Sequence, residues 1–219
     1  SPQTPGAGNP PILNTPWQGS VDLEPAASPA KPQFDLGGSV GELFRTRAAQ
    51  AGWFLLLALI SRASVFGDTS YFNDEYLYFQ FGLRMHDGAL PYVDIWDRKG
   101  PGLFFTYWLI TFFGKTVVVY QAAALLFAAA TAHCVNLIAE HYSSRIGSML
   151  GGSLYLVLLA MFGGGGGQSP VFYNLPMALA ALGVIRTLPA LRRGEAPRLL
   201  YAAMASAGFA LTFKQTAIC

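Results

Sequence analysis

Five apolar segments divide this chain, and their lengths constrain its fold more than any other feature. They cover residues 48–66, 117–140, 146–162, 171–188 and 199–219. About 20 apolar residues in a helix are enough to cross the hydrocarbon layer of a bilayer. Charged residues make up only 12% of the chain and hydrophobic residues 53%, whereas soluble domains carry about twice that charge. We therefore predict an all-α protein, a polytopic transmembrane helical bundle.

The first part of the chain, residues 1–44, is rich in Pro, Ala, Gly and Ser. It has too few large apolar side chains to form a core, which predicts a disordered cytoplasmic tail before a membrane domain at 45–219. The chain begins at Ser1 without an initiator Met and stops at Cys219, at the end of an apolar segment. We expect it to be the N-terminal part of a longer protein, and the fragment alone to be inactive.

A shorter apolar run, residues 103–113, lies between Pro101-Gly102 and Gly114-Lys115. Eleven residues are too few to cross, and the aromatic content favours the headgroup layer, so we predict a juxtamembrane helix. If the chain has five spans and a cytoplasmic N-terminus, the loop 67–116 lies on the non-cytoplasmic side, and seven basic residues outside that loop lie on the cytoplasmic side. The inside residues are Lys31, Arg45, Arg47, Arg145, Arg192, Arg193 and Arg198. This distribution obeys the positive-inside rule and predicts a multi-pass protein of the plasma (inner) membrane.

Half of the carboxylates of the chain lie between residues 67 and 101, together with three basic residues. The acids are Asp68, Asp74, Glu75, Asp87, Asp94 and Asp97, and the bases are Arg84, Arg98 and Lys99. A membrane protein that concentrates paired charge in one loop is expected to bind or react there. We look for function in this loop.

A helix is expected in the first half of the loop. Asn73 is a plausible N-cap, Asp74 and Glu75 follow in the first turn, and Asp87-Gly88 ends the helix. The helix dipole favours ionised acids at this position. Such a carboxylate at the membrane surface acts either as a base or as a plain helix cap, and the sequence leaves both interpretations open.

The second half of the loop, residues 90–101, is rich in Pro and Gly and is expected to be extended. Lys99 comes directly before the juxtamembrane helix, at the depth of lipid phosphates. In a structural role, Lys99 extends to the membrane surface or pairs with Asp97. In a functional role, Lys99 and Arg98 together hold a lipid phosphate.

Other polar residues are assigned to less specific roles. His86 is interpreted as a surface or headgroup contact, and His133 as a helix–helix hydrogen bond. Gly147 and Gly151, four residues apart, indicate close helix packing. A divalent metal is possible but not indicated, and no basic stripe suggests nucleic-acid binding.

Taken together, the loop residues resemble those of the GT-C glycosyltransferases, in the group of protein O-mannosyltransferases, aminoarabinose transferases and RgtA/B/C/D-like proteins. The similar elements are Asp74-Glu75, then Gly88-Ala-Leu-Pro91-Tyr92-Val-Asp94, then Lys99-Gly-Pro101, and a Lys-Gln-Thr-Ala stretch at 214–217. The resemblance covers residues 45–219.

This resemblance implies an all-helical enzyme that transfers a sugar from a polyprenyl-phosphate donor to a glycan, lipid or protein acceptor at the non-cytoplasmic face, without a cofactor. Asp74 matches the catalytic acid of the family, with Glu75 beside it, and Lys99 matches the lysine beside the donor phosphate. Many members carry a second acid at the start of the fourth span, where this chain has Asn174. The remaining candidates are Arg98 and Lys214 for the donor phosphate, and Tyr92, Asp94, Asp97 and Asn174 for the substrate.

Two other classes compete with the transferase. A transporter or flippase is also a polytopic bundle, but it needs charges near the middle of the bilayer, whereas Arg62, Glu140, Arg186 and Lys214 lie toward the ends of their spans. The missing acid near Asn174 also leaves open an inactive fragment of a transferase.

Overall fold

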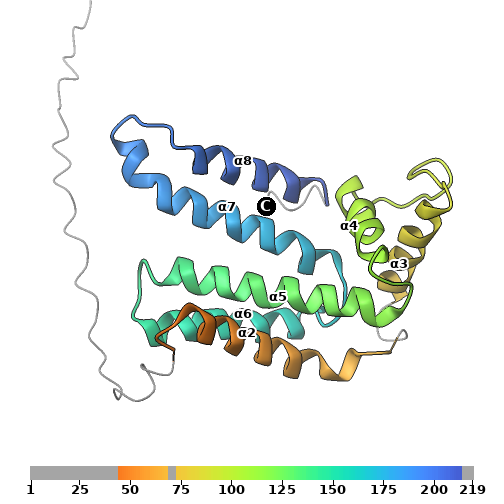
Figure 1. Cartoon of the computed structure of the whole chain (residues 1–219), viewed down its shortest axis with the longest axis horizontal. Helices are drawn as coiled ribbons and strands as arrows, with labels where there is room; N and C mark the ends of the chain where they lie inside the picture. Colours follow the sequence, from red (N-terminus) through yellow and green to blue (C-terminus); the bar gives the residue numbers. More distant parts are fainter. Residues whose placement is uncertain (1–43, 69–72, 214–219) are drawn as a thin grey trace, which may run out of the picture. The chain divides into compact units, whose positions relative to one another are not determined.

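The computed structural model describes residues 44–68 and 73–213, and the regular structure in these two ranges is helical. In chain order the elements are α2 (Arg47–Arg62), the short 3-10 helix η1 (Ala63–Val65), α3 (Asn73–His86), α4 (Pro101–Thr111), α5 (Val117–Ala139), α6 (Arg145–Met161), α7 (Ser169–Arg192) and α8 (Arg198–Leu211) (Figure 1). No strand occurs within 44–68 and 73–213, and one isolated bridge joins Pro91 and Ile95. The predicted all-α fold is confirmed for this part of the chain. The predicted tail, residues 1–44, lies outside it except for Phe44.

Each predicted apolar segment coincides with a helix in the described ranges. Among the helices within 44–68 and 73–213, three are long and apolar enough to cross a membrane: Arg47–Val65, Val117–Ala139 and Ser169–Arg192. The other two, α6 and α8, are shorter apolar helices of 17 and 14 residues. At about 1.5 Å per residue they span less than the hydrocarbon thickness of about 30 Å. Membrane-spanning character therefore rests on three helices, and the five-span arrangement stays a prediction.

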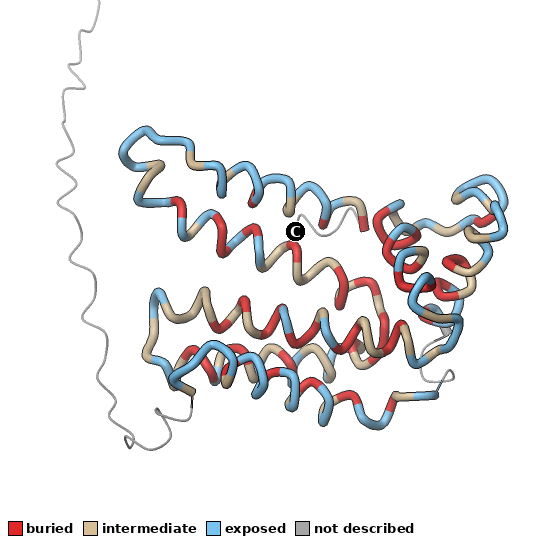
Figure 2. The backbone as a smooth tube through the Cα atoms, in the orientation of Figure 1, coloured by how far each residue is buried: buried red, intermediate tan, exposed pale blue. Residues whose placement is uncertain are grey.

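The helix α5 is the centre of the packing. It contacts α2, α6 and α7, while α7 also packs against α8 and α2 against α6. Figure 2 shows buried positions along α5 and α7 and exposed positions along most of α8. Large apolar side chains such as Ile60, Leu126 and Leu150 are more than half exposed. This pattern fits helices whose outer surfaces face lipid rather than water.

Successive helices of the bundle run in alternating directions, so one end collects the end of α2, the start of α5, the loop between α6 and α7, and the end of α8. The pair α3 and α4 packs at this end, with α4 against α5 and α8. Backbone hydrogen bonds of 3.1 and 3.0 Å run from Gly100 to Phe213 and from Gly102 to Thr212. They tie the start of α4 to the end of α8.

The opposite end carries the arginines that the positive-inside argument placed in the cytoplasm. Arg47 begins α2, Arg145 begins α6, Arg192 ends α7 and Arg198 begins α8. The acidic loop and these arginines are thus separated by the length of the bundle. This separation is what the predicted topology requires.

Both loop helices occur where they were predicted, but Asn73 is the first residue of α3 rather than its N-cap, and the place of α4 on the membrane surface stays a prediction. Residues 103–113 form most of α4, which begins at Pro101 because a proline is well tolerated in the first turn. Leu103 and Tyr107 are buried, whereas Phe112 and Phe113 are exposed. The helix α3 begins at Asn73 itself, and Gly88 follows its end with φ 93°, a conformation that glycine adopts without strain.

Within α6, the close contact with neighbouring helices is at Gly152 rather than at the predicted Gly147 and Gly151. A Cβ at Gly152 would lie 2.6 Å from the Phe54 ring of α2 and 2.7 Å from a backbone oxygen of α5, that of Ala132. A Cβ at Gly151 would meet only Ala139, at an ordinary 3.8 Å. The Gly147 and Gly151 pair lies one residue away from the contact, because the spacing of glycines does not show which face of the helix is covered by a neighbour.

We expect Gly152→Ala to destabilise the protein by about 1–3 kcal/mol, because the added methyl group overpacks the contact with α2 and α5. The matched variant Gly151→Ala is expected to be neutral or stabilising, by up to about 1 kcal/mol, since alanine favours helix. Thermal unfolding in detergent compares the two variants. Equal stabilities would contradict the assignment of the contact.

Candidate functional site

The two acids at the start of α3 point in different directions. Consecutive helix residues are separated by about 100°, so only one of two neighbours faces the bundle. Asp74 is exposed, whereas Glu75 is 3% exposed. The predicted pair of catalytic acids is therefore split into one accessible and one buried carboxylate.

Glu75 lies against the loop of five glycines, residues 163–167, that joins α6 to α7. A Cβ on Gly166 would overlap the Glu75 carboxylate, so a larger residue there would displace this side chain. Burial is the main reason why the pKa of Glu75 is raised to about 7, and the charge of Asp74 raises it further. A hydrogen bond from the Gly167 backbone and the charge of Arg62 lower this pKa. Oε1 of Glu75 has no hydrogen-bond partner within the described ranges.

Arg62 holds the other side of the glycine loop. Its side chain is 2% exposed and donates to the carbonyl oxygens of Gly165 at 2.7 Å, Gly166 at 2.8 Å, and Gly164. A buried guanidinium needs such acceptors because it cannot lose its proton. Arg62 therefore points into the bundle, at the end of α2.

The glycine loop also receives α4. The Tyr107 hydroxyl, on a fully buried side chain, donates to the Gly167 carbonyl at 2.6 Å. The loop therefore connects α2 through Arg62, α3 through Glu75 and α4 through Tyr107. Five glycines in succession after an apolar helix are a sequence signal for such close backbone contacts.

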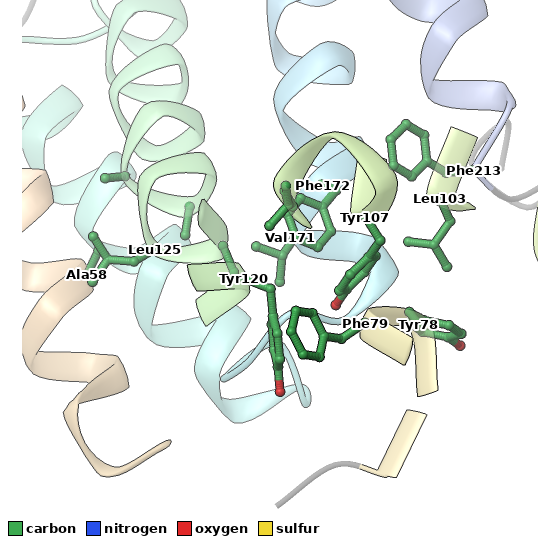
Figure 3. Packing of buried hydrophobic residues seen from close by; sticks show 14 of the residues in the cluster. Ala58, Tyr78, Phe79, Leu103, Tyr107, Tyr120, Leu125, Val171, Phe172 and Phe213 are labelled. Carbon is green, nitrogen blue, oxygen red and sulfur yellow. The ribbon is translucent and has the colours of Figure 1, made fainter. Parts of the chain in front are cut away.

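A cluster of aromatic rings joins the loop helices to the bundle (Figure 3). Tyr107 lies 5.8 Å from both Tyr78 and Tyr120, between ring centroids, and Phe79 lies 5.3 Å from Tyr120. Phe172 of α7 packs edge-on against Tyr107. The cluster thus links α3, α4, α5 and α7 next to the acids.

Tyr78 brings together the acid and the base that the sequence singled out. Its hydroxyl donates a hydrogen bond to Asp74, and burial together with the charges of Asp74 and Asp97 raises the pKa of Tyr78, so it remains a neutral donor. The Lys99 Nζ lies 5.8 Å from the centre of the Tyr78 ring, a cation–π geometry. Asp74 and Lys99, 25 residues apart in the chain, therefore contact the same side chain.

The backbone of Lys99 is held from both sides. Its N–H donates to the Asp97 carboxylate at 2.9 Å, and its carbonyl accepts from the Tyr92 hydroxyl at 2.7 Å. Tyr92 itself has φ 65°, which costs energy for a residue other than glycine. Tyr92 and Asp97, predicted to contact substrate, are thus engaged in positioning Lys99.

The other predicted residues lie apart from this group or outside the described ranges. Asp94 accepts from the Leu90 N–H at 2.9 Å and closes a turn. Arg98 is exposed, and its charge acts on Tyr78. The Asn174 amide donates to the Tyr155 hydroxyl at 3.1 Å, between α7 and α6. Lys214 lies outside the described residues.

His86 and His133 both lie between helices. A hydrogen bond of 2.9 Å joins His86 to Thr111 across α3 and α4, so His86 is less of a surface contact than predicted. The predicted helix–helix hydrogen bond of His133 is wrong for Nδ1, which has no partner in 44–68 and 73–213; its ring packs near Phe54 instead. No group of three metal-ligating side chains occurs in these ranges.

An exposed carboxylate and a nearby ammonium group can accept a proton and stabilise an anion on one substrate. No family model, no curated protein and no solved structure matches the chain. The site is therefore described by its own geometry alone.

We expect the stability of the protein to fall as the pH rises from about 4.5 to about 7. The folded state binds the Glu75 proton more tightly than the unfolded state does, so this stabilisation is complete below the unfolded pKa and is lost above the folded one. The loss is at most about 3 kcal/mol. Glu75→Gln cannot ionise and should remove this part of the pH dependence.

The measurement is thermal unfolding of the wild type and Glu75→Gln in detergent at pH 5 and pH 8. The unfolding temperature of Glu75→Gln relative to that of the wild type should be higher at pH 8 than at pH 5. Comparing the same pair at both pH values removes the contribution of all other titrating groups. A difference that is independent of pH would show that Glu75 does not ionise in this range.

Proposed function

We propose that this chain belongs to a membrane glycosyltransferase that transfers a sugar from a polyprenyl-phosphate donor to an acceptor hydroxyl at the non-cytoplasmic face. The observation that carries the proposal is the meeting of Asp74 and Lys99 at Tyr78. The resemblance of the loop motifs to GT-C enzymes supports the same reaction. The five-span topology and the cytoplasmic N-terminus are part of this proposal.

In this reaction the acceptor hydroxyl attacks the anomeric carbon of the donor sugar. Asp74 takes the hydroxyl proton as general base, a role worth about 10²–10⁴-fold in rate. We choose Asp74 over Glu75 because a base has to touch the substrate, and Glu75 is buried against Gly166. Glu75 acts instead as a positioning residue that fixes α3 on the glycine loop.

The bond between the anomeric carbon and the phosphate oxygen breaks as the new glycosidic bond forms. The polyprenyl phosphate leaves with additional negative charge, which Lys99 and Arg98 stabilise. The hydrogen bonds from Tyr92 and to Asp97 hold Lys99 in place for this purpose. A single displacement inverts the anomeric centre.

The exposed aromatic side chains of α4 suit the lipid end of such a donor. Phe112 is 61% and Phe113 is 86% exposed at the end of α4, where they can enter the headgroup layer. Lys99 precedes the start of the same helix, so the helix joins the phosphate-binding group to the membrane surface.

We expect Asp74→Asn to lower sugar transfer at least about 100-fold in the full-length protein, since the base is lost. Lys99→Met should lower it by a similar factor because the leaving phosphate loses its counter-charge. Asp87→Asn and Lys115→Met are the matched controls, each an exposed charge in the same segment without contact to Tyr78 among the described contacts.

The assay uses the protein in proteoliposomes with polyprenyl-phosphate-linked hexose and pentose donors, and measures both polyprenyl phosphate release and glycosidic product. Undiminished transfer by Asp74→Asn would exclude Asp74 as the base. Movement of the donor across the bilayer without any product would instead support the flippase alternative.

A further inference from the structure

The connection between α3 and α4 exposes large apolar side chains that have no part in the proposed reaction. Val93 and Trp96 are each 76% exposed, and Leu90 is 58% exposed. They lie in the segment 90–96, which we call the apolar loop. A connection that faces water is normally built from small and polar residues. The exposed surface of the apolar loop therefore calls for a partner.

The backbone of the apolar loop is closed by its own hydrogen bonds. The Leu90 carbonyl accepts from the N–H groups of Asp94 at 2.9 Å and Ile95 at 3.3 Å. The Tyr92 N–H donates to the Ile95 carbonyl at 2.6 Å. The loop is thus a defined turn, and the directions of its side chains are fixed before any partner binds.

Two side chains attach this turn to the protein. Ile95 is 2% exposed, and the Tyr92 ring packs edge-on against Phe104 of α4, with 5.2 Å between the ring centroids. Because Ile95 occupies the inner side of the turn, Val93 and Trp96 are held on the outer side. A preformed apolar surface loses little conformational entropy when it is buried.

The apolar loop lies close to the ends of apolar helices. The backbone hydrogen bond from Gly100 to Phe213 ties the chain to the end of α8, and Trp96 is only four residues before Gly100, a reach of at most about 14 Å. Tyr107 of α4 lies against Tyr120, in the first turn of α5. Since α5 is long and apolar enough to cross a membrane, its start marks the edge of the hydrocarbon layer.

The charges beside the apolar loop cancel one another. Arg98 and Lys99 follow it, and Asp94 and Asp97 lie within or next to it. Both carboxylates accept backbone N–H groups, from Leu90 and from Lys99. Two basic and two acidic groups give no net attraction to an anionic surface, so the apolar side chains have to provide the affinity.

We propose that the apolar loop inserts Val93 and Trp96 into the interfacial layer of the lipid bilayer, so that the partner of this surface is the membrane itself. Tryptophan suits this layer because its ring is apolar and its N–H reaches polar groups. The loop attaches the connection between α3 and α4 to the membrane without a requirement for anionic lipid. The inference uses the membrane character of the bundle and does not rest on the transferase proposal.

The test measures the fluorescence of Trp96 in the full chain, reconstituted in nanodiscs of phosphatidylcholine. Trp17, Trp53 and Trp108 are replaced by Phe, which leaves Trp96 as the reporter. Quenching is measured with lipids that carry bromine near the headgroup end or near the methyl end of their acyl chains, and with iodide in solution. The lipid-facing control is Leu126→Trp combined with Trp96→Phe, because Leu126 is 58% exposed in the middle part of α5.

We expect bromine near the headgroup end to quench Trp96 more than bromine near the methyl end, and Leu126→Trp to show the opposite order. Iodide should quench Trp96 less than it quenches a tryptophan peptide in free solution. Strong quenching by iodide without any effect of the brominated lipids would place Trp96 in water. No quenching by either agent would place it against protein, and both results would overturn the proposal.

A second reporter and a second measurement make the test independent of one variant. Val93→Trp combined with Trp96→Phe should show the same depth as Trp96, and a reporter at residue 93 that behaves as in water would overturn the insertion of the loop. If the variant without the other three tryptophans does not fold, the difference between the wild type and Trp96→Phe gives the quenching of Trp96. Trp96→Phe changes only an exposed side chain, so it is expected to fold.

Discussion

The structure depends most on the way a buried guanidinium is satisfied by backbone. Arg62 sits at the end of α2 with almost no exposed surface, and its acceptors are carbonyls of the glycine loop. An uncompensated charge in this position would cost several kcal/mol. Arg62 therefore holds three successive carbonyls of the loop, and the loop also receives Glu75 and Tyr107.

The fixed loop explains how a polar segment of the chain can form a defined site. The helices α3 and α4 contact the bundle through the aromatic cluster around Tyr107. Once these rings and Glu75 are docked, Tyr78 has a fixed position and Asp74 and Lys99 gather around it. The accessible charges of the site are thus positioned by buried groups that no substrate needs to touch.

The sequence predicted the helices well because their limits are local properties. Apolar length identified α2, α5, α6, α7 and α8, and Pro101 and Gly88 marked where α4 begins and α3 ends. The sequence did not predict which of Asp74 and Glu75 faces the bundle, that Gly152 rather than Gly151 is in close contact, or the use of the glycine loop by Arg62. These three features depend on which helix surfaces meet in the folded bundle. For α3, the periodicity of a short, largely aromatic segment does not show which side faces the other helices.

The two ends of the bundle have opposite character, and this asymmetry connects the separate features. One end carries Asp74, Glu75 and aromatic side chains on α3 and α4, and the other carries arginines at four helix termini. Inserting such a bundle in the reverse direction would require the arginines to be translocated, which the positive-inside rule disfavours. The separation of acidic and basic residues along the bundle is therefore the property of this chain that favours one direction of insertion over the other.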